Sequence, residues 1–227
     1  MKQKVLLALL LTAALATTAL IAVNVLAHRQ DQHPFSSSQA DALPPLGNVP
    51  AFALIDQDGN PIDRDRLLGK IWIADFVFTR CSGPCLRMTR RMRRLQQEFA
   101  GLSADIRFLS VSVDPEYDTP QVLRQYATRH DADTETWRFA TTQRTDLHRL
   151  VIEGFKLPLE DAGNSEHRIL HSDRFVLVDQ QGRIRGYYHG MTQRAPDGTV
   201  LPAEMDQLVS DVRKLLSAEP ASQEGSS

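Results

Sequence analysis

Apolar residues in the middle of the chain recur at two different spacings, and these spacings alternate along the sequence. Short runs in which apolar residues are continuous, or lie two positions apart, are typical of strands. These runs cover residues 52–55, 71–78, 106–113, 137–140, 174–178 and 184–188. The run at 71–78 is apolar enough for the centre of a sheet, and the last two runs, joined by a turn, predict a hairpin.

Apolar residues three or four positions apart lie between these runs and predict helices. One predicted helix covers 86–102, with Met88 and Met92 among its apolar positions. Another begins at Thr119-Pro120, because threonine is a good N-cap and proline suits the first helical position. Further helices are expected around 147–151 and 205–215. The alternation predicts an α/β fold with a central mixed β-sheet flanked by helices.

The composition is that of one ordinary globular domain with extensions at both ends. The chain has 227 residues, of which 42% are hydrophobic and 24% charged. We place the domain at 49–217, after a polar stretch at 28–48 that we expect to be a flexible tether. Residues 218–227 are expected to be a disordered tail. The formal net charge of -2 gives no reason to expect nucleic acid as a partner.

The first 27 residues have the character of a membrane segment. Lys2 and Lys4 precede an uncharged stretch at 5–27, which is long enough as a helix to cross a hydrocarbon core of roughly 30 Å. We therefore expect an N-terminal transmembrane anchor at 1–27, although a cleaved signal is the alternative because Val25-Leu26-Ala27 suits a cleavage site. The lysines predict a single-pass protein of the bacterial inner membrane whose domain faces the periplasm.

The chain contains two cysteines, Cys81 and Cys85, and they lie together where a predicted buried strand turns into a helix. The start of a helix favours an anion, so we expect the thiolate, which attacks disulfides and binds metals, to be favoured there. Six arginines lie between residues 80 and 94, with no acidic residue from 76 to 97. Most of them are typical of a solvated helix face, but Arg80 and Arg87 are close enough in sequence to act on the thiols.

Three uses of this cysteine pair compete. A structural disulfide would stabilise little, because it closes a very small loop. A redox pair of the thioredoxin type would normally have two intervening residues, whereas here there are three. The wider spacing suits two sulfurs around one soft ion such as copper(I), and the chain lacks the further cysteines that a structural zinc site would use.

Three blocks of sequence resemble the Sco/SenC family of copper proteins. The first is Phe78-Thr79-Arg80-Cys81 through Cys85. The second is Ser112-Val113-Asp114-Pro115-Glu116 with Asp118-Thr119-Pro120, and the third is His171-Ser172 followed by residues 175–179 and Gly182. The resemblance covers residues 49–216 and implies a thioredoxin-like fold, a membrane tether and a copper site. Two departures, Ser82 and Leu86 where many members have proline, remove no ligand.

Carried over by this resemblance, the copper ligands are Cys81, Cys85 and His171. Two thiolates and an imidazole suit copper(I) and, with a further donor, copper(II). Asp75 lies six residues before Cys81, at the position of the buried acid of thioredoxins, and either relays protons or is a strand-edge aspartate paired with a basic residue. Asp114 either lies next to the metal ligands without binding the metal or simply begins a turn at Asp-Pro.

The expected function is that of a periplasmic, membrane-tethered copper metallochaperone that delivers copper to the copper centre of cytochrome c oxidase or to another copper apoprotein. A thioredoxin-type enzyme would be expected to have a cis-proline before a strand of the terminal hairpin. No proline lies between Pro158 and Pro196 here, and His171 precedes that strand instead. The alternatives are a thiol-disulfide oxidoreductase that reduces the cysteines of the copper target, and a copper or redox sensor.

Overall fold

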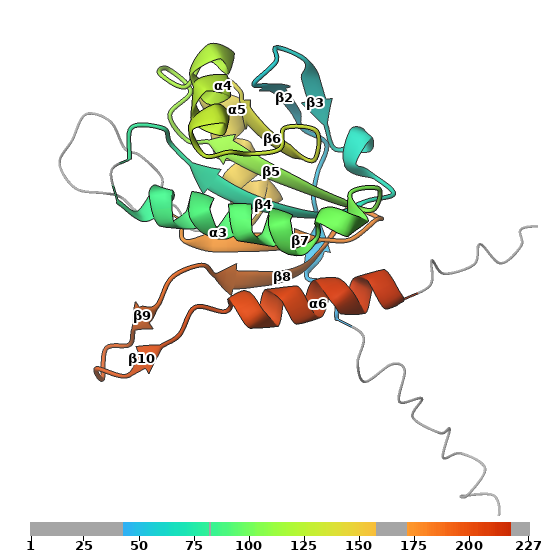
Figure 1. The fold of residues 1–227 in the computed structure, drawn as a ribbon, viewed down its shortest axis with the longest axis vertical. Helices are drawn as coiled ribbons and strands as arrows, with labels where there is room; N and C mark the ends of the chain where they lie inside the picture. Colours follow the sequence, from blue (N-terminus) through green and yellow to red (C-terminus); the bar gives the residue numbers. More distant parts are fainter. Residues whose placement is uncertain (1–42, 82, 158–171, 219–227) are drawn as a thin grey trace, which may run out of the picture. The chain divides into compact units, whose positions relative to one another are not determined.

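The computed structural model describes residues 43–81, 83–157 and 172–218 (Figure 1). The expected anchor at 1–27, most of the tether, nearly all of the tail and the candidate ligand His171 lie outside these ranges. Within the described residues, no helix combines the length and the apolar character needed to cross a membrane.

The described part of the chain is built on an eight-stranded mixed sheet with the order β1-β8-β7-β4-β5-β6-β2-β3. Its strands are β1 (Gly47–Asn48), β2 (Ala53–Asp56), β3 (Pro61–Asp63), β4 (Ile71–Val77), β5 (Ile106–Ser112), β6 (Trp137–Thr141), β7 (Arg174–Val178) and β8 (Arg183–His189). β4, β5 and β6 are parallel, and the remaining pairings are antiparallel. Two further strands, β9 (Gln193–Arg194) and β10 (Val200–Leu201), pair only with each other. The sequence predicted the mixed sheet and the β7-β8 hairpin, and both are confirmed.

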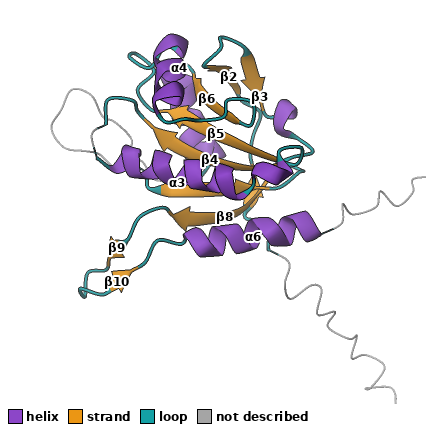
Figure 2. Ribbon diagram, in the orientation of Figure 1, coloured by secondary structure: helices purple, strands orange, loops and turns teal. Residues whose placement is uncertain are grey.

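Helices cover both faces of this sheet (Figure 2). They are α3 (Pro84–Glu98), α4 (Pro120–Arg129), α5 (Arg144–Arg149) and α6 (Met205–Ser217), with the short turns η1 (Asp65–Leu67), η2 (Ala100–Leu102) and the π-helical η3 (Leu150–Gly154). α3, α4 and α6 enclose one buried apolar cluster, and α5 with η3 packs on the cluster of the other face. The predicted helix at 86–102 is two elements, because Phe99 leaves the helical conformation with φ -106° and ψ 16°.

Two adjacent elements, β4 and α3, position the cysteine pair. All seven residues of β4 are buried, which explains its continuous apolar sequence and its central place in the sheet. α3 buries Met88, Met92 and Leu95 on one side and begins with a proline, whose fixed φ suits the first turn. Because β4 and β5 are parallel neighbours, the loops that follow them lie at the same end of the strands. The first two sequence blocks, which contain the cysteine pair and Asp114, lie at this end.

Candidate metal centre

Cys81 and Cys85 lie on either side of the junction between β4 and α3. Cys81 belongs to the loop after β4, where its backbone N–H donates to the carbonyl of Phe78 at 3.2 Å. Cys85 is the second residue of α3. Both thiols are free and buried, at 9% and 5% exposure, and a hydrogen bond joins their side chains. The two sulfurs are therefore close enough to share one soft metal ion or to close a disulfide.

The expectation that the helix start would favour a thiolate is wrong for Cys85. Burial is the largest influence and raises the pKa of the Cys85 thiol, while a hydrogen bond from the Phe78 backbone opposes it only in part. The hydrogen bond with Cys81 and the negative charges of Cys81 and Asp75 raise this pKa further. Desolvation of the thiolate is thus the dominant influence on Cys85. Without a metal, Cys85 is a protonated thiol at neutral pH.

A buried carboxylate holds the loop that leads into Cys81. Asp118 is fully buried and accepts hydrogen bonds from the Thr79 backbone N–H at 3.1 Å, from the Thr79 hydroxyl at 2.5 Å and from the Ser112 hydroxyl at 2.6 Å. Burial raises the pKa of Asp118, and these hydrogen bonds oppose the shift. Sequence reasoning gave Asp118 no role, although its place in the second sequence block was a usable signal. The side chain fixes the backbone two residues before the first sulfur.

Asp114 acts on the same loop through Arg80. Its buried carboxylate accepts hydrogen bonds from Arg80 Nε at 3.1 Å and from Arg80 Nη2 at 2.5 Å. The Arg80 guanidinium also stacks over the ring of Tyr117, 4.3 Å from its centroid. Arg80 was expected to act on the thiols, but its charge is instead paired with Asp114. Asp114 thus holds Arg80, the residue that precedes Cys81, and its role in supporting a metal site stays a prediction.

Asp75 lies in the core beneath the sulfurs and is fully buried. Its Oδ1 accepts a hydrogen bond from the Ser110 hydroxyl at 2.6 Å, and Ser110 accepts one from Trp137 Nε1 at 2.9 Å. Its Oδ2 has no partner among the described residues, and no described basic residue pairs with it. Burial raises the pKa of Asp75 to about 7. The alternative of an ion-paired strand-edge aspartate is therefore not what the structure has.

The third expected ligand, His171, is not among the described residues, but the residues after it are. Asp173 lies just before β7, and both of its carboxylate oxygens are 3.1 Å from Nδ1 of His189 at the end of β8. His189, the histidine nearest to this block in the described part, is thus already paired. No group of three or more His, Cys, Asp or Glu side chains among the described residues is arranged to hold a metal ion. A third ligand at His171 therefore stays a prediction.

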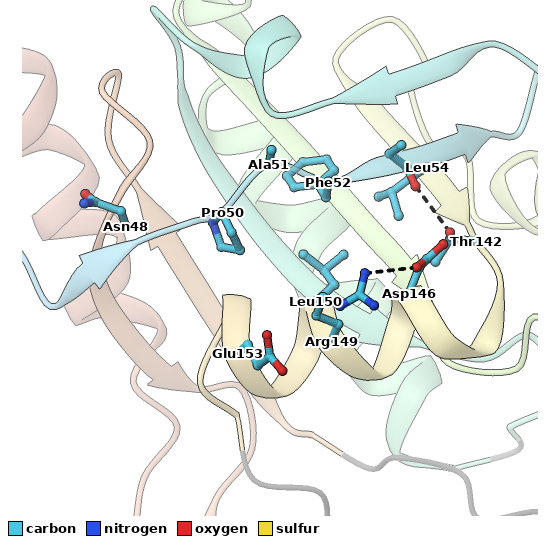
Figure 3. Close-up of a pocket in the computed structure, with 11 residues that line it drawn as sticks. Asn48, Pro50, Ala51, Phe52, Leu54, Thr142, Asp146, Arg149, Leu150 and Glu153 are labelled. Atoms are coloured by element: carbon cyan, nitrogen blue, oxygen red, sulfur yellow. Dashed lines mark hydrogen bonds and ion pairs between the residues drawn. The ribbon is translucent and has the colours of Figure 1, made fainter.

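A groove of about 660 Å³ lies apart from these residues, between the segment entering β2 and the α5-η3 helix (Figure 3). Thr142 donates a hydrogen bond to the carbonyl of Ala53 on one side, and Asp146 pairs with Arg149 at 3.4 Å on the other. None of the candidate site residues lines it. The groove therefore adds nothing to the chemistry of the cysteine pair.

Comparison with known proteins identifies relatives in sequence and in structure. A sequence model of the family described as SCO1/SenC matches residues 42–200. The SCO1 protein homolog of Bacillus subtilis is 30% identical over 166 residues, which are 73% of this chain and 81% of that protein. The range matched by the family model includes the cysteine pair and all eight strands of the main sheet.

Solved structures share the architecture. BsSco, described as a member of the Sco family of cytochrome c oxidase assembly proteins with a disulfide switch, has a TM-score of 0.64 at 29% identity, covering 77% of this chain and 97% of that one. ScoI of Bradyrhizobium japonicum, solved with copper bound, has a TM-score of 0.58 and covers 74% of this chain and 99% of that one. At 18% identity, the second likeness shows the fold alone. The expected thioredoxin-like α/β fold is confirmed.

Proposed function

This chain belongs to the SCO1/SenC family, and we propose that it is a copper metallochaperone that supplies the copper centre of cytochrome c oxidase. The family includes copper-binding proteins and takes part in the assembly of this oxidase. In the proposal, residues 1–27 tether the protein to the bacterial inner membrane and the domain works in the periplasm. Cys81, Cys85 and His171 hold the copper ion while it is carried.

The observation that carries this proposal is the placing of the only two thiols of the chain side by side, free and buried, at the start of α3. Sulfur ligands in such a pair select copper(I) over harder ions. His171 is bonded to Ser172, and β7 begins two residues later beside β4, with Ala74 opposite Val176. Since β7 runs antiparallel to β4, its first residues lie at the edge where β4 ends, which supports His171 as the third ligand.

Copper binding in this site is coupled to loss of protons. The Cys85 thiol is held protonated by burial, so copper has to displace its proton. Copper(I) then passes to the acceptor by exchange of ligands, in which acceptor ligands replace the sulfurs one after another. The oxidation state of the metal does not change, and the Cys85 sulfur takes up a proton again when copper leaves.

A second candidate function is supported by the hydrogen bond between the two thiols and by the disulfide switch described for BsSco. Cys81 and Cys85 would reduce a disulfide between the copper-ligand cysteines of the target. Two electrons and two protons would pass to the target, leaving a disulfide between Cys81 and Cys85. Copper delivery and this reduction use the same sulfurs, so they exclude each other at any one moment.

Copper stoichiometry and affinity test the proposal. The reduced full-length chain in detergent is titrated with copper(I) against a chromophoric chelator, for the wild type and for Cys81→Ser, Cys85→Ser and His171→Ala. We expect one tightly bound ion in the wild type and a large loss of affinity in each variant. His148→Ala, at an exposed position of α5, is the control and should bind as the wild type does. A wild type without tight copper binding, or His171→Ala with unchanged affinity, contradicts the proposed site.

A further inference from the structure

Helix α3 carries a group of positive charges that starts two residues after Cys85. We call it the arginine face, and it consists of Arg87, Arg90, Arg91, Arg93 and Arg94. With 3.6 residues per turn, the exposed Arg87, Arg90 and Arg94 lie on the side of the helix opposite its buried residues. The half-buried Arg91 and Arg93 flank them on either side. The helix has no acidic residue in its first turn, and its only carboxylate is Glu98 at the last position.

The fold gains nothing from this grouping of charges. Like charges three or four positions apart on a helix cost about 0.2–0.5 kcal/mol per pair, and cations in the first half of a helix oppose its dipole. Charge repulsion is visible at Arg91, whose pKa is lowered chiefly by partial burial and further by the charges of Arg94 and Arg87. A cluster of like charges that destabilises the helix carrying it is expected where the cluster serves binding.

Contacts among the described residues do not pair this charge with any carboxylate. Arg90, Arg93 and Arg94 have no hydrogen bond or ion pair to any residue that the structure describes. Arg87 and Arg91 donate only to neutral acceptors, the sulfur of Met191 and the carbonyl of Gly190. Other exposed arginines of the domain do find carboxylates, for example Arg144 with Glu116 at 2.9 Å and Arg213 with Glu98.

We propose that the arginine face is the docking surface for an acidic patch on the protein that receives the copper, a proposal that rests on the proposed function. Copper can pass by ligand exchange only while the acceptor's ligands are held at the cysteine pair, and this pair lies at the start of the helix that carries the arginine face. Cys85 itself is on the buried side of α3, so the acceptor has to cover the start of the helix as well as its exposed side. Guanidinium groups pair with carboxylates through two parallel hydrogen bonds, which fixes orientation as well as distance.

Charge balance across the whole chain adds to this argument. The formal net charge is -2, so the positive charge concentrated on α3 is offset by an excess of negative charge elsewhere. Such an asymmetric molecule turns its positive face towards an acidic partner before contact, which raises the rate of productive encounters.

An anionic membrane surface is the competing occupant of the arginine face. Docking of α3 on lipid would cover the helix start with headgroups and keep the acceptor's ligands from Cys85.

The test compares two charge reversals of equal size. The Arg90→Glu/Arg94→Glu variant reverses two exposed charges of the arginine face, and the Arg66→Glu/Arg149→Glu variant reverses two exposed charges on η1 and α5. Both change the net charge equally. The probe is the copper-free soluble copper-centre domain of a cytochrome c oxidase subunit. Its equilibrium binding to the full-length chain, and the rate of copper(I) transfer, are measured in neutral detergent at increasing salt, alongside copper stoichiometry and urea unfolding.

We expect the wild type to bind the probe and to lose both binding and transfer rate as salt rises. The reversal on the arginine face should slow transfer at low salt by about tenfold or more and abolish most of the salt dependence, since steering charges act mainly on association. Copper stoichiometry should stay unchanged. The matched reversal on η1 and α5 should leave binding, transfer and salt dependence as in the wild type.

Several results would overturn the proposal. Unchanged binding and transfer in Arg90→Glu/Arg94→Glu would do so, as would an equal loss in the matched variant or a wild type that does not bind the probe. Loss of binding to phosphatidylglycerol vesicles with transfer intact would instead assign the surface to the membrane. A wild type that binds the probe through the arginine face but takes up no copper would contradict the proposed function and leave the docking surface supported.

Discussion

Replacing the buried Asp75 with asparagine should stabilise the protein at alkaline pH and have little effect in acid. Burial raises the pKa of Asp75 from 3.8 to about 7 in the folded protein, whereas the unfolded chain ionises near 3.8. Between these values the folded state holds a proton that the unfolded state has lost. The contribution of this group to stability is therefore fully present below about pH 4 and is lost as pH rises through about pH 7.

The size of the effect follows from the same two values. A change from 3.8 to about 7 in pKa corresponds to about 4 kcal/mol at a pH above both. Relaxation around the ionised carboxylate reduces this figure. The amide nitrogen of asparagine would also lie where Oδ2 lacks a hydrogen-bond partner, which costs free energy. We therefore expect a net gain in the free energy of unfolding of about 2 kcal/mol at pH 8. The asparagine oxygen can still accept the hydrogen bond from Ser110.

Urea unfolding of the reduced, copper-free protein at about pH 4, about pH 6 and about pH 8 measures this difference. The free energy of unfolding of Asp75→Asn should exceed that of the wild type by an amount that grows with pH. Asp146→Asn, which removes an exposed carboxylate of α5, serves as the control and should show no such trend. An Asp75→Asn variant that is no more stable than the wild type at pH 8 would refute the assignment of Asp75 as a buried, partly protonated acid.

Three further predictions concern the surroundings of the cysteines. Asp118→Ala removes the acceptor of three hydrogen bonds, two of them from Thr79, and should lower the free energy of unfolding by about 2–4 kcal/mol. A urea titration that gives a loss of less than about 1 kcal/mol would contradict the role of Asp118 in holding the loop before Cys81. Gly190→Ala would place a Cβ 2.3 Å from the sulfur of Met88, so thermal unfolding should show a loss of about 1–3 kcal/mol, and a neutral result would contradict this packing. Copper(I) affinity should rise about tenfold per pH unit for the proton displaced from Cys85, and a chelator competition that is flat between about pH 6 and about pH 8 would be inconsistent with a protonated thiol.

The elements with long apolar patterns were predictable, and the short ones were not. β4 and α3 lie where the sequence predicts them, because seven consecutive buried positions and a helical repeat of apolar residues leave little choice. β1, β9 and β10 have two residues each, too few for any period to be visible. β1 pairs with β8, which lies far along the chain, and β9 and β10 pair only with each other.

The candidate site was predictable in its sulfurs and not in their surroundings. The spacing of Cys81 and Cys85 is local information, and so is their place between a strand and a helix. The hydrogen bonds of Asp118 to Thr79 cross 39 positions and arise only when the β4 and β5 loops meet. The protonated state of Cys85 depends on burial by the whole domain, which a local sequence pattern does not reveal.

The measurement that most directly tests the central claim is X-ray absorption at the copper edge of the copper(I)-loaded, full-length protein. The proposed site predicts two sulfur scatterers and one nitrogen scatterer around a single copper ion. In His171→Ala the nitrogen should disappear while both sulfurs stay, and in Cys85→Ser one sulfur should be lost. A nitrogen contribution unchanged in His171→Ala, or a sulfur contribution unchanged in Cys85→Ser, would contradict the copper site proposed for this chain.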